Sequence, residues 1–247
     1  AKDTVPGYNG HTWAPDVAFH NGRFLVYYSV STFGKNRSAI GVVSNATLNP
    51  EHPNYQWIDH GAVVVSKPGT TNWNAIDANF ILNENGEPYL SFGSFWGGLQ
   101  LVKLSPDGLK TAGSPAEFQT ICTRNTSENA VEAPFIFKKD DWFYLFASFD
   151  FCCRGAESTY KVVVGRSRQL TGPYVDAQGQ SMLEGGGSLV VEGNERYAGV
   201  GHNAVASFNG TDYLIFHAYD MQRSGTSFLR ILPISWQNGW PVVSPQF

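Results

Sequence analysis

The sequence predicts an all-β fold of the propeller type, and three observations support this prediction. A short unit occurs four times, in which an ionisable residue stands just before an aromatic, strand-like run; these residues, spaced 61, 55 and 70 positions apart, are Asp16, Asp77, Glu132 and His202. Apolar residues alternate or form short runs between turn signals, and no long stretch has helical periodicity. Repeats that hold several strands are typical of propeller blades around a central channel.

Each predicted blade begins with a strand, passes through a polar turn and continues with an aromatic second strand. The turns are marked by Asn21-Gly22, Asn85-Gly86 and Asn209-Gly210, pairs that favour tight hairpins. A third strand follows, for example at Gly41–Ser44 and Gly165–Ser167. After an irregular lead-in at residues 1–12, we expect blades at residues 13–66, 70–122, 129–190 and 199–247. No linker separates them, so residues 1–247 are expected to form a single β-propeller domain.

Composition narrows the classes of partner. The net charge of −4 and the pI near 5.8 argue against nucleic acid as a partner, because phosphate backbones are bound by basic surfaces. No apolar run is long enough to cross a bilayer, so no membrane partner is expected. A neutral ligand fits this net charge best. Aromatic residues make up 14% of the chain against 15% charged residues, which suggests many buried strands and surfaces that stack on sugars or bases.

The three cysteines, Cys122, Cys152 and Cys153, fit neither a disulfide framework nor a zinc motif. The adjacent pair forms either a vicinal disulfide in an oxidising compartment or two reduced thiols in a loop. The sequence leaves both alternatives open.

The four repeated ionisable residues point to chemistry at the channel, because equivalent positions in propeller blades face the same axis. Glycoside hydrolysis needs a carboxylic acid that protonates the leaving oxygen and a carboxylate that activates water. Glu132 lies between apolar residues, which favour its protonated form, so it is the expected acid. Asp77 suits a role in tuning and orienting that acid. The alternative is that these carboxylates bind only a structural cation or cap turns.

At these positions the chain resembles the glycoside hydrolases of family 43, and among them most of all the arabinanases. The resemblance spans nearly the whole chain in order, and its combination of motifs is more specific than any one of them. The matching segments are His11–Val17, Tyr28–Gly34, Asn74–Asn79, Ser91–Gly98, Glu132–Phe135, Cys152-Cys153, Ser158–Tyr160, Gly165–Ser167, Gly172–Tyr174, Met182–Gly187, Gly201–Asn203 and Gly239–Val242.

The resemblance implies a five-bladed β-propeller, of which about four blades are present here, and hydrolysis of α-1,5-linked arabinofuranose chains with inversion. By motif, Glu132 would be the general acid and Asp77 the residue that tunes it. His202 would lie beside a bound calcium or another cation, and no organic cofactor is implied. Residues expected to contact the sugar are Trp13, Phe33, Asn74 and Asp16. For Trp13 and Phe33, the alternative is an ordinary place in the core.

The chain departs from the family pattern at its start. The family's general base is an aspartate ahead of the Trp-Ala-Pro-Asp segment, which here is Trp13–Asp16 near the first residue. Three explanations are considered. The first blade is a separate, cleaved N-terminal peptide that remains a partner, the chain is truncated, or Asp16 serves as base in a smaller ring. The first two are favoured, because an incomplete ring would leave sheet edges and apolar faces uncovered.

Two other functions are kept beside arabinan hydrolysis. Within the same fold, the chain could be an α-L-arabinofuranosidase or β-xylosidase, and from another class it could be a non-catalytic carbohydrate-binding propeller. Polymeric arabinan lies outside cells, so a secreted or periplasmic location is expected.

Overall fold

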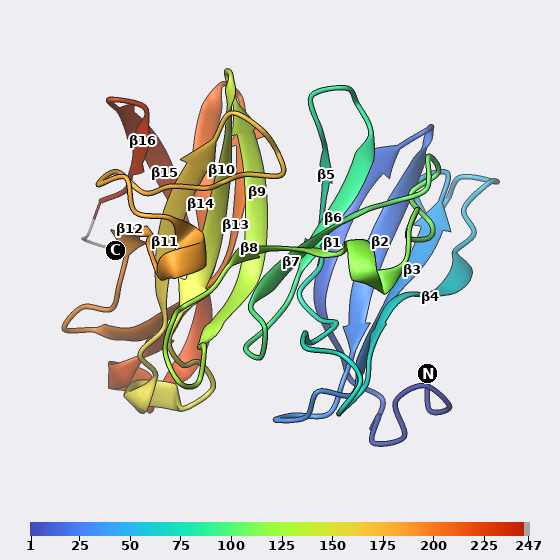
Figure 1. The fold of residues 1–247 in the computed structure, drawn as a ribbon, viewed down its shortest axis with the longest axis horizontal. Coiled ribbons are helices and arrows are strands. Elements are labelled where there is room, and N and C mark those ends of the chain that lie inside the picture. The colour runs from blue at the N-terminus through green and yellow to red at the C-terminus, as the bar shows by residue number, and fades with distance from the viewer. Residues whose placement is uncertain (245–247) are drawn as a thin grey trace. The chain divides into compact units, whose positions relative to one another are not determined.

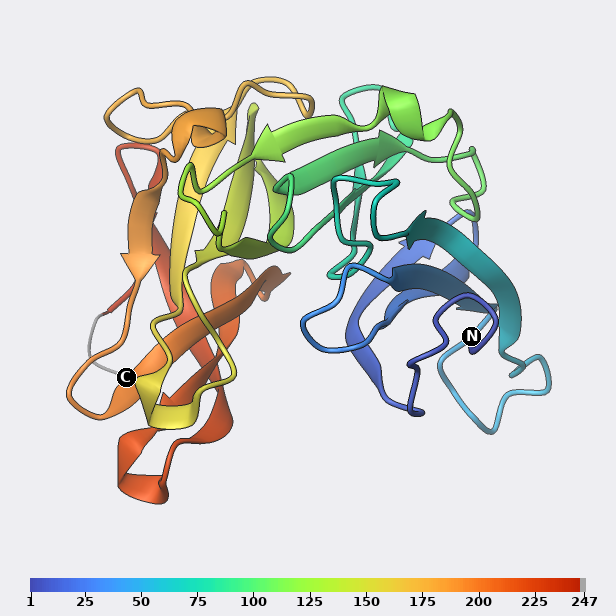
Figure 2. The ribbon, with the colours of Figure 1, turned by 60° about the horizontal axis from the view of Figure 1, so that its bottom comes forward.

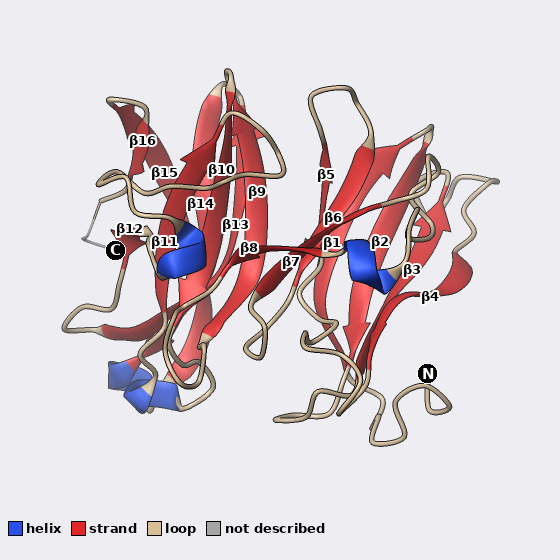
Figure 3. Cartoon of the chain, viewed as in Figure 1, coloured by secondary structure: helices blue, strands red, loops and turns tan. Residues whose placement is uncertain are grey.

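The computed structural model describes residues 1–244, and its regular elements are sixteen β-strands and four short 3₁₀ turns (Figures 1 and 3). The strands form four four-stranded sheets in which sequential neighbours pair. The all-β prediction is therefore confirmed. In the described part of the chain, no helix has the length and apolar character needed to span a membrane.

The chain divides into two compact units, and the first comprises residues Ala1–Thr120. It contains the sheets β1-β2-β3-β4 and β5-β6-β7-β8. Their strands and the one 3₁₀ turn are β1 (Thr12–His20), β2 (Arg23–Val30), β3 (Ser38–Asn45), β4 (Ile58–Ser66), β5 (Asn79–Leu82), β6 (Pro88–Phe92), β7 (Leu99–Lys103), η1 (Pro115–Glu117) and β8 (Gln119–Cys122), whose last two residues lie past the boundary.

The second unit starts at Ile121 and contains the sheets β12-β11-β10-β9 and β13-β14-β15-β16. Its elements are β9 (Val131–Lys139), β10 (Trp142–Phe149), η2 (Gly155–Glu157), β11 (Lys161–Ser167), η3 (Met182–Glu184), β12 (Ser188–Val191), β13 (Tyr197–Phe208), β14 (Thr211–Asp220), η4 (Met221–Arg223), β15 (Thr226–Gln237) and β16 (Trp240–Val242).

The four sheets coincide with the four blades predicted from the repeat. The predicted end of the fourth blade, at residue 247, lies outside the described residues. Four blade-like sheets are thus present, and a fifth blade and a single domain over 1–247 stay predictions.

Hairpin turns close where the sequence signals predict them. Asn21 and Gly22 between β1 and β2 both have left-handed backbone, with φ of 49° and 76°, and Asn209 and Gly210 between β13 and β14 repeat this at 48° and 79°. Two consecutive left-handed residues form the turn whose twist matches paired strands, and asparagine and glycine adopt that backbone most easily.

Alternation along the strands builds a large apolar core in each unit. On β2, Leu25 and Tyr27 are fully buried, and they pack with Ile40 and Val42 of β3. In the second unit Phe146 of β10 and Phe216 of β14 belong to the corresponding core. Because side chains on a strand alternate between faces, each sheet buries one row of large residues against its neighbour.

The lead-in before β1 is irregular, as predicted, but it is packed against the first sheet (Figure 2). Val5 is fully buried and contacts Val30 at the end of β2 and Ala39 on β3. Burial of this valine attaches the first residues of the chain to the sheet.

Candidate active site

Near the start of each sheet lies a residue other than glycine that has left-handed backbone. These residues, with their φ angles, are Ala14 (43°), Asp77 (60°), Ala133 (52°) and His202 (51°). At Ala14, Ala133 and His202 the strand pairing shifts by an extra residue, as in a β-bulge, whereas Asp77 lies two residues before β5 and its sheet has no such shift there. We take the left-handed residue as the equivalent position of each repeat.

Measured from the left-handed residue, the four ionisable residues do not occupy equivalent positions, so that prediction is wrong. Asp77 and His202 are the left-handed residues themselves, whereas Glu132 lies one position before Ala133 and Asp16 lies two positions after Ala14. The sequence comparison aligned the four ionisable residues with one another, whereas the structural repeat aligns the four left-handed residues. Whether the four side chains converge stays a prediction.

Glu132 lies near the start of β9 in a buried, apolar setting. Its side chain is 9% exposed, and Val131 and Ala133 beside it are buried. The hydroxyl of Tyr160, also buried, donates a hydrogen bond to Oε1 of Glu132. The hydrogen bond fixes the orientation of the carboxyl group, as proton transfer between it and a ligand requires.

Two histidines of the second unit lie near Glu132. His202 on β13 interacts electrostatically with Glu132: loss of hydration lowers the pKa of His202, and the negative charge of Glu132 opposes that shift. Part of His202 is exposed to solvent, which limits the first effect. Burial, and then the neighbouring His202, lowers the pKa of His217 to about 4, so that ring is neutral at neutral pH.

Three polar residues that the sequence reasoning missed complete this group. Ser148 on β10 is the register partner of Glu132 and donates a hydrogen bond of 3.0 Å to Oδ1 of Asn203. Within the described residues, the buried Nδ2 of Asn203 and Nε2 of His217 have no hydrogen-bond partner. Buried donors without partners are rare, so both nitrogens are available to water or a ligand.

In the first unit, Asp77 lies just before β5 and is 6% exposed. Its backbone N–H donates a hydrogen bond of 3.1 Å to Oγ of Ser29 on β2. A left-handed backbone is unfavourable for an aspartate, so contacts such as this one must hold it.

Asn74, predicted to bind the sugar, is buried in a network of serines. Its Oδ1 accepts hydrogen bonds from Oγ of Ser38 at 2.6 Å and of Ser66 at 3.5 Å. These bonds fix the loop that leads to Asp77. A role for Asn74 in sugar binding stays a prediction.

Asp16 joins the two sheets of the first unit. Its Oδ2 accepts a hydrogen bond of 2.8 Å from the backbone N–H of Phe80 on β5. Loss of hydration raises the pKa of Asp16 to about 6, although this hydrogen bond and one from Asn79 oppose the shift. This link accounts for a partly buried carboxyl without a ligand, and the contact of Asp16 with sugar stays a prediction.

The raised pKa of Asp16 predicts a loss of stability as pH rises. The folded state binds this proton more tightly than the unfolded state, whose value is 3.8, so the free energy of unfolding should fall between about pH 4 and pH 6. We expect Asp16→Asn to remove about 1–2 kcal/mol of that fall, after allowance for partial exposure. Urea unfolding at pH 4 and pH 6.5 measures it. Asp3→Asn, at an exposed site, is the control; identical pH dependence of Asp16→Asn and the unmodified chain would contradict the assignment.

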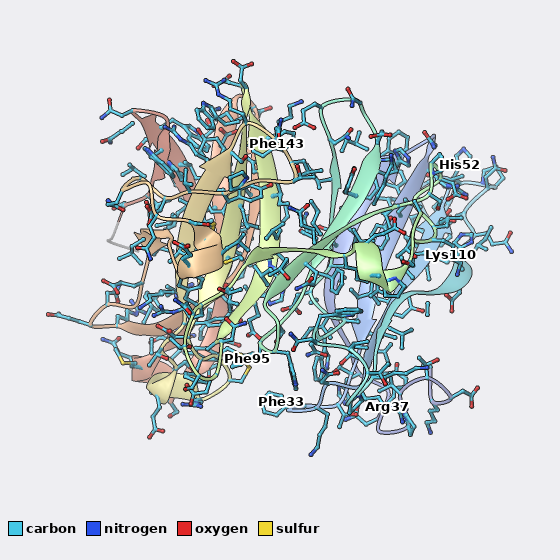
Figure 4. The ribbon with its side chains drawn as sticks, in the orientation of Figure 1. Phe33, Arg37, His52, Phe95, Lys110 and Phe143 are labelled. Carbon is cyan, nitrogen blue, oxygen red and sulfur yellow. A yellow bond between two sulfur atoms is a disulfide. The ribbon has the colours of Figure 1, made fainter. Side chains whose placement is uncertain are left out.

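The two aromatic residues expected at the sugar differ in exposure. Trp13 is partly buried on β1, opposite Ser29. Phe33 lies on the loop after β2, outside the sheets, and is 74% exposed (Figure 4). Phe33 is thus no core residue, and its ring is open to a ligand.

Calcium or another cation is expected beside His202. Among the residues that the structure describes, no group of three or more His, Cys, Asp or Glu side chains is placed to hold a metal ion. Calcium takes six to eight oxygen ligands, some of which can be waters. A cation beside His202 stays a prediction, and no step below depends on it.

Cys152 and Cys153 are joined by a disulfide, which decides between the two alternatives left open above. The backbone N–H of Cys153 donates to the hydroxyl of Tyr219 on β14 at 2.9 Å. The loop after β10 is therefore attached to the neighbouring sheet, on which His217 lies.

Comparison with known proteins gives the chain a family context. Residues 1–241 match the model of the glycosyl hydrolases of family 43. The extracellular exo-α-(1→5)-L-arabinofuranosidase ArbA of Cellvibrio japonicus is 48% identical over 253 residues, covering 98% of this chain and 73% of that protein. The extracellular endo-α-(1→5)-L-arabinanase 1 of Bacillus subtilis is 41% identical over 237 residues, covering 96% and 70%.

Solved structures agree with these relatives. The α-L-arabinanase of Cellvibrio cellulosa, solved in complex with arabinohexaose, superimposes with a TM-score of 0.93 at 47% identity, covering 99% of this chain and 80% of that one. An exo-1,5-α-L-arabinanase from a bovine ruminal metagenomic library gives a TM-score of 0.95 at 49% identity, covering 99% and 81%.

Proposed function

Because the chain belongs to the glycosyl hydrolases of family 43, we propose that it cleaves the α-1,5-linked L-arabinofuranose chains of plant arabinan with inversion. Relatives above 40% identity are named for exo- and endo-acting enzymes on this linkage, and one is solved with arabinohexaose. The observation that carries the proposal is the buried Glu132, which is hydrogen-bonded to Tyr160 and flanked by apolar residues.

In the proposed reaction, Glu132 gives its proton to the glycosidic oxygen as the bond from that oxygen to the anomeric carbon breaks. Water attacks the same carbon from the opposite face and loses its proton to a carboxylate base, so one water is consumed for each bond cleaved. Asp77 orients Glu132 and favours its protonated form by like-charge repulsion. Trp13 and Phe33 stack on sugar rings, while Asn74 and Asp16 support the loops that carry the site.

We further propose a fifth blade, supplied by a segment outside residues 1–247, which brings the base. Support comes from two rows of exposed apolar residues: Val17 and Phe19 on β1 are 57% and 63% exposed, and Leu229 and Ile231 on β15 are 66% and 55% exposed. Such rows usually face a partner surface. A denaturing intact-mass spectrum of active protein tests this, and the 27.1 kDa chain alone with full activity would refute it.

The proposed location is outside the cytoplasm, either secreted or periplasmic. Two relatives are named extracellular, and the Cys152–Cys153 disulfide agrees with an oxidising compartment.

Substrate choice tests the function directly. We expect the protein to release arabino-oligosaccharides or arabinose from linear arabinan at least about 100-fold faster than it cleaves an aryl β-xyloside, because specificity is a difference in transition-state binding. Reducing-end assays on the two substrates measure it. Preference for the xyloside would favour the alternative of a β-xylosidase, and binding of arabinan without cleavage would favour a non-catalytic propeller.

A further inference from the structure

The same kind of hydrogen bond occurs in both units, at the left-handed residue near the start of a sheet. In the first unit, Oγ of Ser29 accepts from the backbone N–H of Asp77 at 3.1 Å. In the second unit, Oγ of Ser148 accepts from the backbone N–H of His202 at 2.9 Å. Both serines are fully buried, and Asp77 and His202 both have left-handed backbone.

The two serines occupy the same place in their sheets. Each lies near the end of the second strand, and its side chain reaches the first strand of the next sheet or the residues just before it. In strand register, Ser29 is opposite Trp13 and Ser148 is opposite Glu132. Each serine therefore lies opposite a proposed site residue in its own sheet, and its hydroxyl bonds the left-handed residue near the start of the next sheet.

These two left-handed residues need such an acceptor. At His202 an extra residue interrupts the ladder of backbone hydrogen bonds, and Asp77 lies before β5, outside any ladder, so the backbone N–H of each needs another partner. Left-handed backbone at aspartate or histidine also persists only where the surroundings enforce it. The direction in which the Asp77 side chain leaves the backbone depends on that φ angle, and the same holds for His202.

We propose that Ser29 and Ser148 are positioning residues of the active site. Ser29 sets the direction of the Asp77 side chain, and Ser148 holds His202 and Asn203 beside Glu132. This proposal rests on the proposed function for its effect on turnover. A purely structural role, in which the serines only join neighbouring sheets, predicts a lower unfolding temperature with normal turnover of the folded protein.

The test compares Ser29→Ala and Ser148→Ala with two other buried serines of the same sheets. The matched controls are Ser44→Ala on β3, whose Oγ bonds the ring of His60, and Ser167→Ala on β11, whose Oγ accepts from Gln169. We expect kcat on linear arabinan to fall about 10- to 100-fold in the first pair, with KM changed less than about threefold, because small misplacements of catalytic groups cost that much. The controls should keep kcat within about twofold.

Ser29→Thr and Ser148→Thr keep the hydroxyl and should recover part of the lost kcat. Amide hydrogen exchange, followed in peptides around Asp77 and His202, gives a readout that does not need activity. Exchange should speed up at least about tenfold around Asp77 in Ser29→Ala and around His202 in Ser148→Ala. Normal kcat in both alanine variants, an equal fall in the controls, or unchanged exchange at these two positions would overturn the proposal. Absence of arabinan cleavage by the unmodified protein would instead refute the proposed function, while the exchange result still decides whether the serines hold the two left-handed residues.

Discussion

Glu132→Gln is expected to lower kcat on linear arabinan by about 10²- to 10⁴-fold, the usual contribution of a general acid. Glutamine keeps the size of the side chain and can still accept from the Tyr160 hydroxyl, but it has no acidic proton to give to the leaving oxygen. Arabino-oligosaccharide binding, measured by titration calorimetry, should change less than about threefold.

Two comparisons make this result specific to acid catalysis. Glu184→Gln, at an exposed position on η3, should leave kcat unchanged. In an arabino-oligosaccharide that carries a dinitrophenyl group, the dinitrophenolate leaves without being protonated. Glu132→Gln should therefore slow the hydrolysis of this substrate far less than that of arabinan. Unchanged turnover of arabinan by Glu132→Gln would contradict the assignment of Glu132 as the general acid.

Asp77→Asn is expected to lower kcat by about 10²- to 10³-fold with little change in KM. Asparagine tolerates left-handed backbone as well as aspartate does, so the backbone at position 77 and its bond to Ser29 should survive. What is lost is the negative charge that we propose keeps Glu132 protonated and oriented.

The matched control for this variant is Asp140→Asn. Asp140 also has left-handed backbone, with φ of 53°, but it lies exposed between β9 and β10. Steady-state kinetics on linear arabinan, together with thermal unfolding, separates loss of charge from loss of fold. If Asp77→Asn turned over within about twofold of the unmodified protein, Asp77 would have no part in catalysis.

Blade boundaries could be predicted because they depend on local signals. Pairs such as Asn21-Gly22 have a backbone preference that fixes the hairpin, and the alternation that buries Leu25 and Tyr27 is visible in the sequence. The family resemblance agreed with the roles already inferred for Glu132 and Asp77, and the structure places both residues in buried, hydrogen-bonded positions.

The register of the repeat could not be predicted in the same way. A bulge adds one residue to a strand without changing its composition, so aligning Asp16 with Asp77 and Glu132 gave the wrong equivalence. Ser29 and Ser148 were visible at the ends of their aromatic runs, but a serine that ends a strand carries no sign of the distant amide it will bind. That contact spans 48 residues for Ser29 and 54 for Ser148.

The stereochemistry of the first product tests the central claim most directly. Proton NMR during cleavage of linear arabinan by the unmodified protein, recorded before the sugars mutarotate, identifies the anomer that is released. Inversion at an α-linked furanose predicts that the β-anomer appears first. First release of the α-anomer, or no new reducing ends at all, would contradict the account of Glu132 as the acid of an inverting arabinan hydrolase.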